Sequence, residues 1–305
     1  MRTVIVTGAA GNLGRLVVQQ LHRRYHVVAV DRRPVDRLPK DVTTVRADVR
    51  WRAMEDVFRT CSVFGVVHMG IIHNPRNEIG QYRYNVAGTQ RLLEVSAQYG
   101  VHKLVVLSSA NIYGPHPDNS HFLTEDAPLL GAEHYVEIRD LVAVDRIVES
   151  FFYRRPEVST VMLRPVHVIG PRVRNAPSNY LRLERPMTVM GFDPMVQLIH
   201  EEDVVQAILL ALEQDAKGVF NVVGPGEAPL SKILDVLGRR PRPVPMAVAR
   251  RLLQTGWGLG LLGFPPPEIR HIQFHCIVDG RSAREQLGFV PRFDLIQTIR
   301  SVLDQ

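Results

Sequence analysis

A glycine-rich segment near the start of the chain, Thr7-Gly8-Ala9-Ala10-Gly11-Asn12-Leu13-Gly14, constrains the fold most strongly. It follows the apolar run 4–6, which is typical of a buried strand, and it precedes residues 16–21, whose apolar positions have helical spacing. Glycines allow a tight turn and the close approach of a ligand, and the free N–H groups and dipole of a helix start favour an anion. The spacing is G-x-x-G-x-x-G rather than the G-x-G-x-x-G of the dinucleotide fingerprint. In this strand–turn–helix context it still predicts a pyrophosphate cradle.

A second apolar run, residues 25–30, ends at Asp31, which lies 20 residues after Gly11. An acid at the end of the second strand accepts hydrogen bonds from the adenosine ribose hydroxyls and repels a 2′-phosphate. This position therefore favours NAD over NADP as the cofactor. Arg32 and Arg33 follow directly and are compatible with a 2′-phosphate, so NADP remains the less favoured alternative.

Composition excludes several classes of protein. The chain has 305 residues, of which 45% are hydrophobic and 22% charged, as is typical of a globular protein with one large domain or two closely packed ones. Its 2 cysteines, Cys61 and Cys276, are too few for a disulfide framework or a cysteine zinc site, and they fit a reducing compartment. We therefore expect a cytoplasmic protein without a metal site, and without a signal peptide because the first strand begins at once.

Neither a membrane nor a nucleic acid is expected as a partner. The longest apolar stretch, residues 252–264, contains Gln254, Thr255 and four glycines and is too short to span a bilayer. The net charge is +6, but the arginines are scattered along the sequence and aromatic residues do not interleave with them. That pattern is typical of solvated faces rather than of a nucleic-acid surface.

Predicted strands and helices alternate along the first half of the chain, which indicates an α/β fold with a doubly wound parallel sheet of the Rossmann type. Strands are expected at 4–6, 25–30, 42–47, 64–69, 104–108, 160–163 and 220–223, helices at 53–59, 84–99, 135–153 and 204–212, and a loop at 171–186. We expect a dinucleotide-binding domain over 1–170, to which 196–223 returns. Residues 171–195 and 224–305 are expected to form a smaller substrate-binding lobe.

Ordered motifs run along essentially the whole chain. They are T-G-A-A-G-N-L-G (7–14), D-V (48–49), N-V-A-G-T (85–89), S-S-A-N-I-Y-G (108–114), R-P-V-H-V-I-G-P (164–171), H-E-E-D-V (200–204), G-V-F-N-V-V-G (218–224), D-G-R (279–281) and L-G-F-V-P (287–291). In this order they resemble the motifs of the extended short-chain dehydrogenase/reductase family, the group of nucleotide-sugar epimerases and dehydratases that includes UDP-glucose 4-epimerases.

The resemblance implies NAD-dependent chemistry at a hydroxyl or carbonyl of a small-molecule substrate, such as a sugar nucleotide. In the family a serine orients the substrate, a tyrosine transfers a proton as hydride moves, and a lysine four residues later lowers the tyrosine pKa from its ordinary value of about 10. These positions fall on Ser109, Tyr135 and Arg139. The cofactor-binding residues implied are Gly8, Ala10, Gly11, Asn12, Leu13, Gly14, Asp31, Arg32, Asp48, Val49, Met69, Gly70, Asn85, Leu107, Tyr135, Arg139, Pro165 and His167.

The first departure from the family pattern is that Tyr-x-x-x-Lys has become Tyr135-x-x-x-Arg139. Arginine stays cationic and can bind ribose hydroxyls, but it cannot exchange its own proton. A literal Tyr-x-x-x-Lys occurs at Tyr99 and Lys103, but it is not the catalytic motif, because Gly100 ends the preceding helix and Lys103 opens a strand. The alternatives to an oxidoreductase or epimerase/dehydratase are a catalytically weak NAD(P)-binding sensor or scaffold and a non-redox lyase or cyclase.

The second departure concerns the substrate. The family's arginine four residues before the histidine of H-V-D-D is here Val196, and valine cannot clamp a diphosphate. The candidate replacements are Arg172, Arg174, Arg182, Arg185 and Arg270. His167 stands where the family has an asparagine, either as a packing change or as an acid/base group. His271 and His275 lack the accompanying ligands of a metal site.

The resemblance also implies a homodimer formed through a four-helix bundle. The helices concerned are those expected at 84–99 and 135–153. The apolar residues expected to supply the seam are Leu92, Leu93, Val95, Val142 and Phe151.

Overall fold

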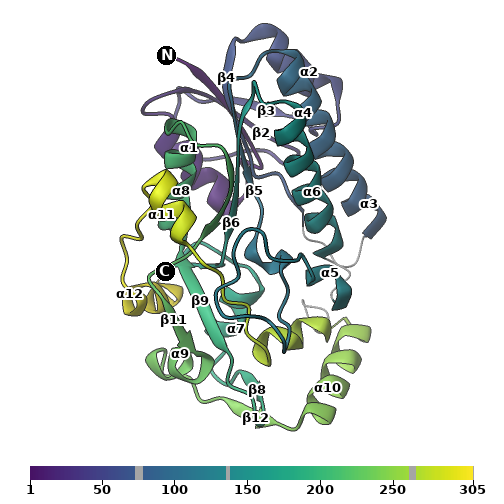
Figure 1. Cartoon of the computed structure of the whole chain (residues 1–305), viewed down its shortest axis with the longest axis vertical. Helices are drawn as coiled ribbons and strands as arrows, with labels where there is room; N and C mark the ends of the chain where they lie inside the picture. The colour runs from purple at the N-terminus through teal and green to yellow at the C-terminus, as the bar shows by residue number, and fades with distance from the viewer. Residues whose placement is uncertain (73–77, 135–137, 261–265, 305) are drawn as a thin grey trace.

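The computed structural model describes residues 1–72, 78–134, 138–260 and 266–304. Within these residues, parallel strands form a central sheet in the order β10-β6-β5-β4-β1-β2-β3 (Figure 1). The strands are β1 (Thr3–Thr7), β2 (His26–Asp31), β3 (Thr43–Arg46), β4 (Val63–His68), β5 (Lys103–Leu107), β6 (Ser159–Pro165) and β10 (Gly218–Val222). The predicted doubly wound parallel sheet is confirmed. Its order reverses between β1 and β4, where ligands bind in open α/β sheets.

Helices cover both faces of this sheet (Figure 1). One face carries α1 (Asn12–Leu21), α8 (Glu201–Glu213) and α11 (Arg281–Leu287), and the other carries α2 (Arg52–Thr60), α4 (Gly88–Gln98) and α6 (Arg139–Arg154). Each layer buries its own apolar cluster against the sheet. Except for the exposed edge strand β3, the strands are mostly buried and apolar on both sides, as a sheet covered on both faces requires.

A smaller lobe packs beyond the carboxyl ends of the strands (Figure 1). It contains a sheet of β11 (Glu227–Pro229), β9 (Met195–His200) and β7 (His167–Ile169), and a pair formed by β12 (Arg242–Val244) and β8 (Met187–Val189). Its helices are α7 (Ala176–Arg182), α9 (Leu230–Val236), α10 (Met246–Gly258), α12 (Leu295–Arg300) and the 3-10 segment η4 (Pro266–Ile272). Of the expected returning segment 196–223, α8 and β10 join the central domain, whereas β9 pairs with β7 and β11.

Two local expectations differ from the structure, and a third lies partly outside the described residues. The segment 171–186 is not a loop throughout, because Asn175 caps α7 by accepting a hydrogen bond from the Ser178 amide and Pro177 lies in the first turn. The expected helix 84–99 begins as a π-helical segment, η1 (Arg83–Ala87), which continues from α3 (Glu78–Tyr82). The expected helix 135–153 is described only from Arg139, after α5 (Gly131–His134).

The residues assigned to a dimer seam lie inside the subunit. Leu92, Leu93, Val95, Val142 and Phe151 are between 1% and 7% exposed, because α4 and α6 turn these side chains toward the central sheet. The exposed residues of α4 are polar, among them Gln90, Arg91, Glu94 and Gln98. The expectation that these five side chains form the seam is therefore wrong, while the homodimer itself stays a prediction that light scattering can test.

Lys103 has a structural role, as the sequence indicates. Its side chain lies at the amino end of β5 and donates hydrogen bonds to Ser159 Oγ at 3.0 Å, Gln214 O at 2.8 Å and Ala216 O at 2.7 Å. Burial lowers the pKa of its ammonium to about 8. The side chain lies at the amino end of the strands, whereas the glycine-rich loop lies at their carboxyl end. The prediction that Tyr99 and Lys103 are not a catalytic pair is therefore confirmed.

A buried ion pair connects several elements near the carboxyl ends of the strands. The guanidinium of Arg164 on β6 binds both carboxylate oxygens of Asp145 on α6, with Nε and Oδ2 separated by 3.0 Å, and both side chains are at most 2% exposed. Asp145 also accepts from Ser108 Oγ at 2.9 Å. Arg164 donates to the Tyr113 hydroxyl at 2.7 Å, and that hydroxyl donates to Asn221 Oδ1 at 2.9 Å. The pair thus connects α6, the carboxyl ends of β6 and β10, and the segment that follows β5.

The substitution Asp145→Ala should destabilise the protein strongly. It leaves the Arg164 charge buried without its partner, and losing one member of such a pair costs about 3–5 kcal/mol. The free energy of unfolding in urea measures the effect. Glu157→Ala, which breaks an exposed pair with Arg155, should cost at most about 1 kcal/mol. Equal costs for the two substitutions would contradict the assigned role of the buried pair.

Candidate active site

Backbone sterics fix the glycine-rich loop at the point where the strand order reverses. Gly8 has a φ of +74°, and a Cβ at this position would lie 2.6 Å from the carbonyl oxygen of Met69, which follows β4. A Cβ on Gly14 would collide with the carbonyl oxygen of Gly8. The Gly11 amide donates to Gly8 O at 3.0 Å and closes the turn. These glycines are therefore needed to pack β1, α1 and the end of β4 together.

The start of α1 offers free donors to an anion. Gly11 is the N-cap and supplies no side-chain cap, and the first turn holds no acidic residue. The first amides of a helix have no intrahelical acceptor, and here they follow a loop without bulky side chains. This arrangement fits a pyrophosphate, as the sequence predicts.

Asp31 is held against the same loop. Its Oδ2 accepts from the Ala10 amide at 3.0 Å and its Oδ1 from the Arg33 amide at 2.9 Å, while the residue is 8% exposed. A carboxylate oxygen has more than one lone pair, so both oxygens can accept a further hydrogen bond. The carboxylate is thus fixed at the end of β2, where an adenosine ribose would lie.

Next to Asp31, an aromatic ring lies between two arginines. The guanidinium carbons of Arg32 and Arg50 lie 4.4 and 5.8 Å from the centroid of the Tyr84 ring. Burial raises the pKa of the Tyr84 hydroxyl to about 12, so the ring stays neutral. Asp48 binds Arg50 through both carboxylate oxygens, at 2.9 and 2.7 Å. Sequence reasoning found Arg32 and Asp48 but missed Tyr84, since the aromatic side chain looked like part of a helix core.

Several predicted cofactor-binding residues are buried or half-buried next to the site. Asn85 is 1% exposed, and its amide group both accepts from and donates to the backbone of Ile72, at 2.8 Å in each case. It therefore holds the loop after β4. Val49 and Pro165 are also buried, whereas Met69 and Leu107 are half-buried at the ends of their strands.

A buried histidine, which sequence reasoning missed, links the same strands. The His68 imidazole lies 2.7 Å from Thr7 Oγ1 and 2.9 Å from Thr89 Oγ1. Burial lowers its pKa to about 4. His68 therefore stays neutral and connects β1, β4 and α4 beneath the glycine-rich loop.

The catalytic candidates lie at the next strand end. Ser109 follows β5, is half-buried, and accepts a hydrogen bond from the Asn111 amide at 3.2 Å through its Oγ. Arg139 is exposed in the first turn of α6, with its guanidinium carbon 6.0 Å from the centroid of the Tyr82 ring. Tyr135 lies outside the described residues, so the structure does not place it relative to Ser109 and Arg139.

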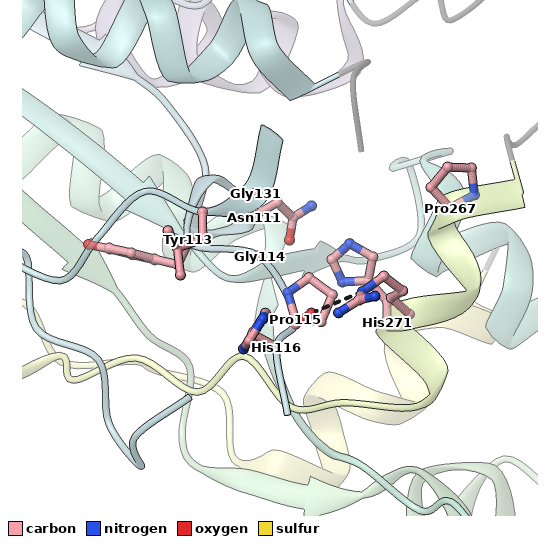
Figure 2. Close-up of a pocket in the computed structure, with 10 residues that line it drawn as sticks. Asn111, Tyr113, Gly114, Pro115, His116, Gly131, Pro267 and His271 are labelled. Atoms are coloured by element: carbon pink, nitrogen blue, oxygen red, sulfur yellow. Dashed lines mark hydrogen bonds between the residues drawn. The ribbon is translucent and has the colours of Figure 1, made fainter. Parts of the chain in front are cut away.

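A small cavity opens between the loop after β5 and the smaller lobe (Figure 2). Its lining residues are Asn111, Tyr113, Gly114, Pro115, His116, Leu130, Gly131, Pro267, Arg270 and His271. Arg270 donates to Pro115 O at 3.5 Å, and burial lowers its pKa. The ring of His271 lies edge-to-face against that of His167 at 5.6 Å, and burial lowers their pKa values to about 3 and about 4. The cavity wall therefore combines the Arg270 cation with the neutral imidazole of His271.

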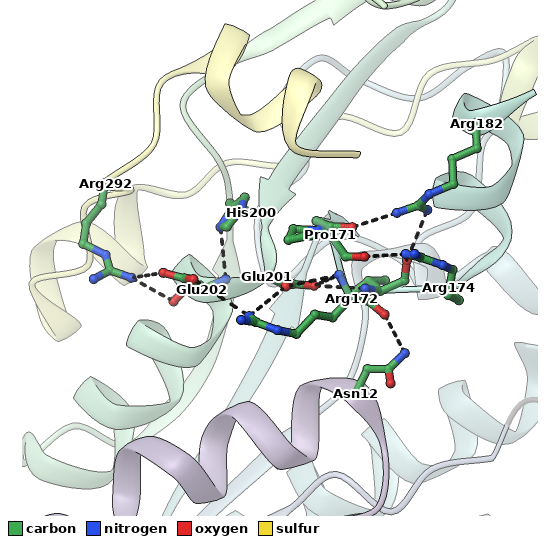
Figure 3. Close-up of polar contacts among 11 residues, drawn as sticks. Asn12, Pro171, Arg172, Arg174, Arg182, His200, Glu201, Glu202 and Arg292 are labelled. Atoms are coloured by element: carbon green, nitrogen blue, oxygen red, sulfur yellow. Dashed lines mark hydrogen bonds and ion pairs between the residues drawn. The ribbon is translucent and has the colours of Figure 1, made fainter. Parts of the chain in front are cut away.

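Three of the other candidate arginines, Arg172, Arg174 and Arg182, bind protein groups away from the cavity, and the exposed Arg185 does not line it (Figure 3). Arg172 pairs with the buried Glu201 at 3.3 Å, and its carbonyl accepts from Asn12 Nδ2 at 2.6 Å. Arg174 donates to Pro171 O at 2.6 Å, and Arg182 donates to Gly170 O at 2.9 Å. Of these candidates, Arg270 is the one that lines the cavity.

Comparison with known proteins identifies the family. The model of the NAD dependent epimerase/dehydratase family matches residues 4–223. The chain belongs to this family. The relationship covers the central sheet, the glycine-rich loop, Ser109 and the Arg164–Asp145 pair, and NAD is the cofactor of the family.

Individual relatives agree with this assignment. The chain is 26% identical to the uncharacterized protein Rv0501 of Mycobacterium tuberculosis over 97% of this chain and 82% of that protein. It is 33% identical to UDP-glucose 4-epimerase 4 of Oryza sativa over 59% of this chain and 52% of that enzyme. The structure of MoeE5 with UDP-glucuronic acid and NAD superposes with a TM-score of 0.74 and 24% identity, over 98% and 97% of the two chains. Thermotoga maritima UDP-glucose 4-epimerase superposes with a TM-score of 0.75 and 21% identity, over 99% and 97%.

Two absences concern the described residues. No group of three or more histidine, cysteine, aspartate and glutamate side chains is placed there to hold a metal ion. In those residues no helix has the length and apolar character needed to cross a membrane.

The buried His68 should make stability depend on pH. Its pKa is about 4 in the folded protein and about 6.5 when unfolded, so between these values the unfolded chain binds a proton that the folded chain does not. Stability should fall as the pH falls through this window, by up to about 1.4 kcal/mol per unit. His68→Asn should be less stable at pH 7, yet its urea unfolding free energy should vary less steeply between pH 6.5 and 4. The exposed His102→Asn should keep the parent slope, and an unchanged slope in His68→Asn would contradict this assignment.

Proposed function

We propose that this protein is an NAD-dependent epimerase or dehydratase acting on a sugar nucleotide at a hydroxyl or carbonyl carbon. The observation that carries the proposal is the arrangement at the strand ends. The uncapped start of α1, the fixed carboxylate of Asp31 and the hydroxyl of Ser109 lie at the ends of neighbouring segments of one sheet. The family assignment and the epimerases among its relatives support this proposal. Two unpaired thiols, Cys61 and Cys276, are consistent with a cytoplasmic enzyme.

The residues present fit NAD. The backbone of the loop 8–14 would hold the pyrophosphate, Asp31 the adenosine ribose, and Arg32 with Tyr84 the side wall next to it. When bound, NAD supplies reversible hydride transfer to and from a carbon of the substrate. Asp31 disfavours a 2′-phosphate, and this supports NAD over NADP despite the neighbouring arginines.

The chain's own residues would move the proton. Ser109 Oγ would orient the reacting hydroxyl, since the Asn111 amide already fixes the position of that oxygen. Tyr135 would accept the hydroxyl proton and return it to the carbonyl oxygen. Arg139, four residues later in the sequence, would favour the tyrosinate as a permanent cation and would bind ribose hydroxyls. Because arginine does not exchange its own proton, Tyr135 would have to exchange directly with solvent or substrate.

Arg270 supports a phosphate-containing substrate. Val196 removes the family's usual arginine, whereas the guanidinium of Arg270 lies on the cavity wall and has donors left beyond its bond to Pro115 O. A diphosphate bound there would meet a partly desolvated cation, which strengthens such a contact.

One observation favours a second candidate, an NAD-binding sensor or scaffold. Arg139 replaces the lysine of the catalytic motif and contacts the ring of Tyr82. The two candidates differ in what Tyr135 does. An enzyme loses turnover when its phenol is removed, and a sensor loses nothing.

Substitution at Tyr135 and Arg139 tests the mechanism. Tyr135→Phe should lower turnover of UDP-glucose at least about 100-fold while leaving NAD affinity within about twofold, because the phenol acts in proton transfer. Arg139→Lys should retain activity and shift its pH profile, since lysine can titrate. Turnover and NAD binding are measured on the same preparations, and full activity in Tyr135→Phe would reject the proposed role.

Asp31→Asn should change cofactor preference. Losing a charged acceptor at the ribose should weaken NAD about 10- to 100-fold, because a hydrogen bond to a charged group contributes about 1.5–3 kcal/mol. NADP should be weakened less, since the carboxylate no longer repels its phosphate. Calorimetric titration of both cofactors measures the ratio, with Asp36→Asn as the control. A parallel loss for both cofactors would show that Asp31 does not select between them.

The nucleotide content of the purified protein separates the reaction types. Tightly retained NAD indicates a cycle in which the cofactor is regenerated on the protein, as an epimerase or dehydratase requires. Empty protein with exchangeable NAD indicates a simple dehydrogenase or the sensor. Failure to bind either cofactor would overturn the proposed function.

A further inference from the structure

The far end of the smaller lobe is formed by α10 and the β8–β12 pair (Figure 1). The inner side of α10 packs Ala249 and Leu253 against Val189 and Ile269 in a small apolar cluster. This packing leaves the remaining sides of α10, including the side that flanks Ala249 and Leu253, facing outward. The lobe thus ends in a helix that is attached along one side and uncovered along the other.

The uncovered side of α10 carries an apolar stripe. Val248, Leu252 and Leu259 are 47%, 56% and 68% exposed. Their spacing of four and then seven residues places them along one side of the helix and its C-cap. Met190, 55% exposed, lies near the start of α10, because its amide donates at 3.0 Å to the carbonyl of Val244, which lies just before α10. We call these four residues the lobe-end stripe.

Unpaired arginines lie at the same end of the lobe as the lobe-end stripe. The segment 236–267 contains five arginines and no aspartate or glutamate. Four of them, Arg240, Arg242, Arg250 and Arg251, are exposed, and among the described residues none has a carboxylate oxygen within 4.0 Å. Several exposed arginines elsewhere do form ion pairs, for example Arg59 with Glu55. The nearby acids Glu184 and Asp193 flank this face without pairing with these four arginines.

We propose that the lobe-end stripe and its arginines dock this protein onto the surface of an anionic lipid bilayer. A helix with an apolar side bordered by arginine lies in the plane of the membrane interface, its apolar residues among the acyl chains and its cations at the phosphates. Each arginine near such a surface contributes about fivefold in affinity. Because α10 lies flat and does not cross the bilayer, its short length is no obstacle.

The charge of this face argues against two other partners, a second copy of the chain and a nucleic acid. Two copies meeting through this face would place four unpaired arginines opposite four more, and like charges repel. A nucleic acid would pair with the arginines but would leave the apolar lobe-end stripe without a partner. An anionic bilayer satisfies both the cations and the apolar residues.

Vesicle binding tests the proposal with the full chain. The protein is mixed with vesicles of phosphatidylcholine alone or of phosphatidylcholine with 30% phosphatidylglycerol, and the bound fraction is measured by sedimentation. We expect binding to the mixed vesicles, at least about tenfold weaker binding to pure phosphatidylcholine, and loss of binding as salt is raised. Absence of binding to the anionic vesicles at low salt would overturn the proposal.

Variants assign any binding to this face. Arg250→Gln with Arg251→Gln, and separately Val248→Ser with Leu252→Ser, should each weaken vesicle binding at least about tenfold while NAD binding stays unchanged. The control variants are Arg23→Gln with Arg52→Gln, and Tyr153→Ser, which alter exposed residues on the central domain. Equal binding by all variants would overturn the proposal. If Val248→Ser with Leu252→Ser instead converts a dimer to a monomer in light scattering and leaves vesicle binding intact, the stripe is a contact between copies of the chain.

Discussion

The buried pair of Arg164 and Asp145 is the interaction on which the rest of the structure depends. Desolvating two charges costs several kcal/mol per ion, so the pair is tolerated only where every donor and acceptor finds a partner. Ser108, the Tyr113 hydroxyl and the carbonyl of Glu125 supply those partners. The chain meets this requirement only when β6, α6 and the loop after β5 are all in place. The loop that carries Ser109 therefore follows a fixed path, and the candidate site inherits that rigidity.

At the glycine-rich loop, steric constraints on the backbone fix the structure, and no charged pair of the described residues is involved. Gly8 and Gly14 bring backbone atoms so close together that no side chain fits, and this locks the loop onto β4 and α1. His68 then joins the same strands through two threonine hydroxyls. The glycine-rich loop is thus built on backbone contacts, while the position of the candidate catalytic residue Ser109 depends on a side-chain network. The two halves of the site rest on different physical supports within one sheet.

Sequence alone predicted the features that depend on local chemistry. The glycine spacing, the acid at Asp31 and the position of Lys103 at the start of a strand each follow from backbone rules. Features that depend on which neighbour covers a residue were missed. Apolar spacing shows that Leu92 and Phe151 face something apolar, but not that it is the subunit's own sheet rather than a second subunit. Likewise, the sequence does not show whether the Asn85 amide group binds a ligand or the chain itself. The structure shows that it binds the backbone of Ile72.

Positive charge is distributed unevenly across the molecule, because the arginines of some regions have carboxylate partners and those of other regions do not. Near the sheet, arginines such as Arg164 and Arg50 are neutralised by carboxylates on neighbouring elements. On the cavity wall, Arg270 contacts the carbonyl of Pro115 and the ring of Phe274, and under the proposed function its charge would bind a phosphate. At the lobe end the arginines stand beside apolar side chains instead. Sequence order scatters these residues, and folding sorts them into a structural set, a ligand-facing cation and an outward-facing surface.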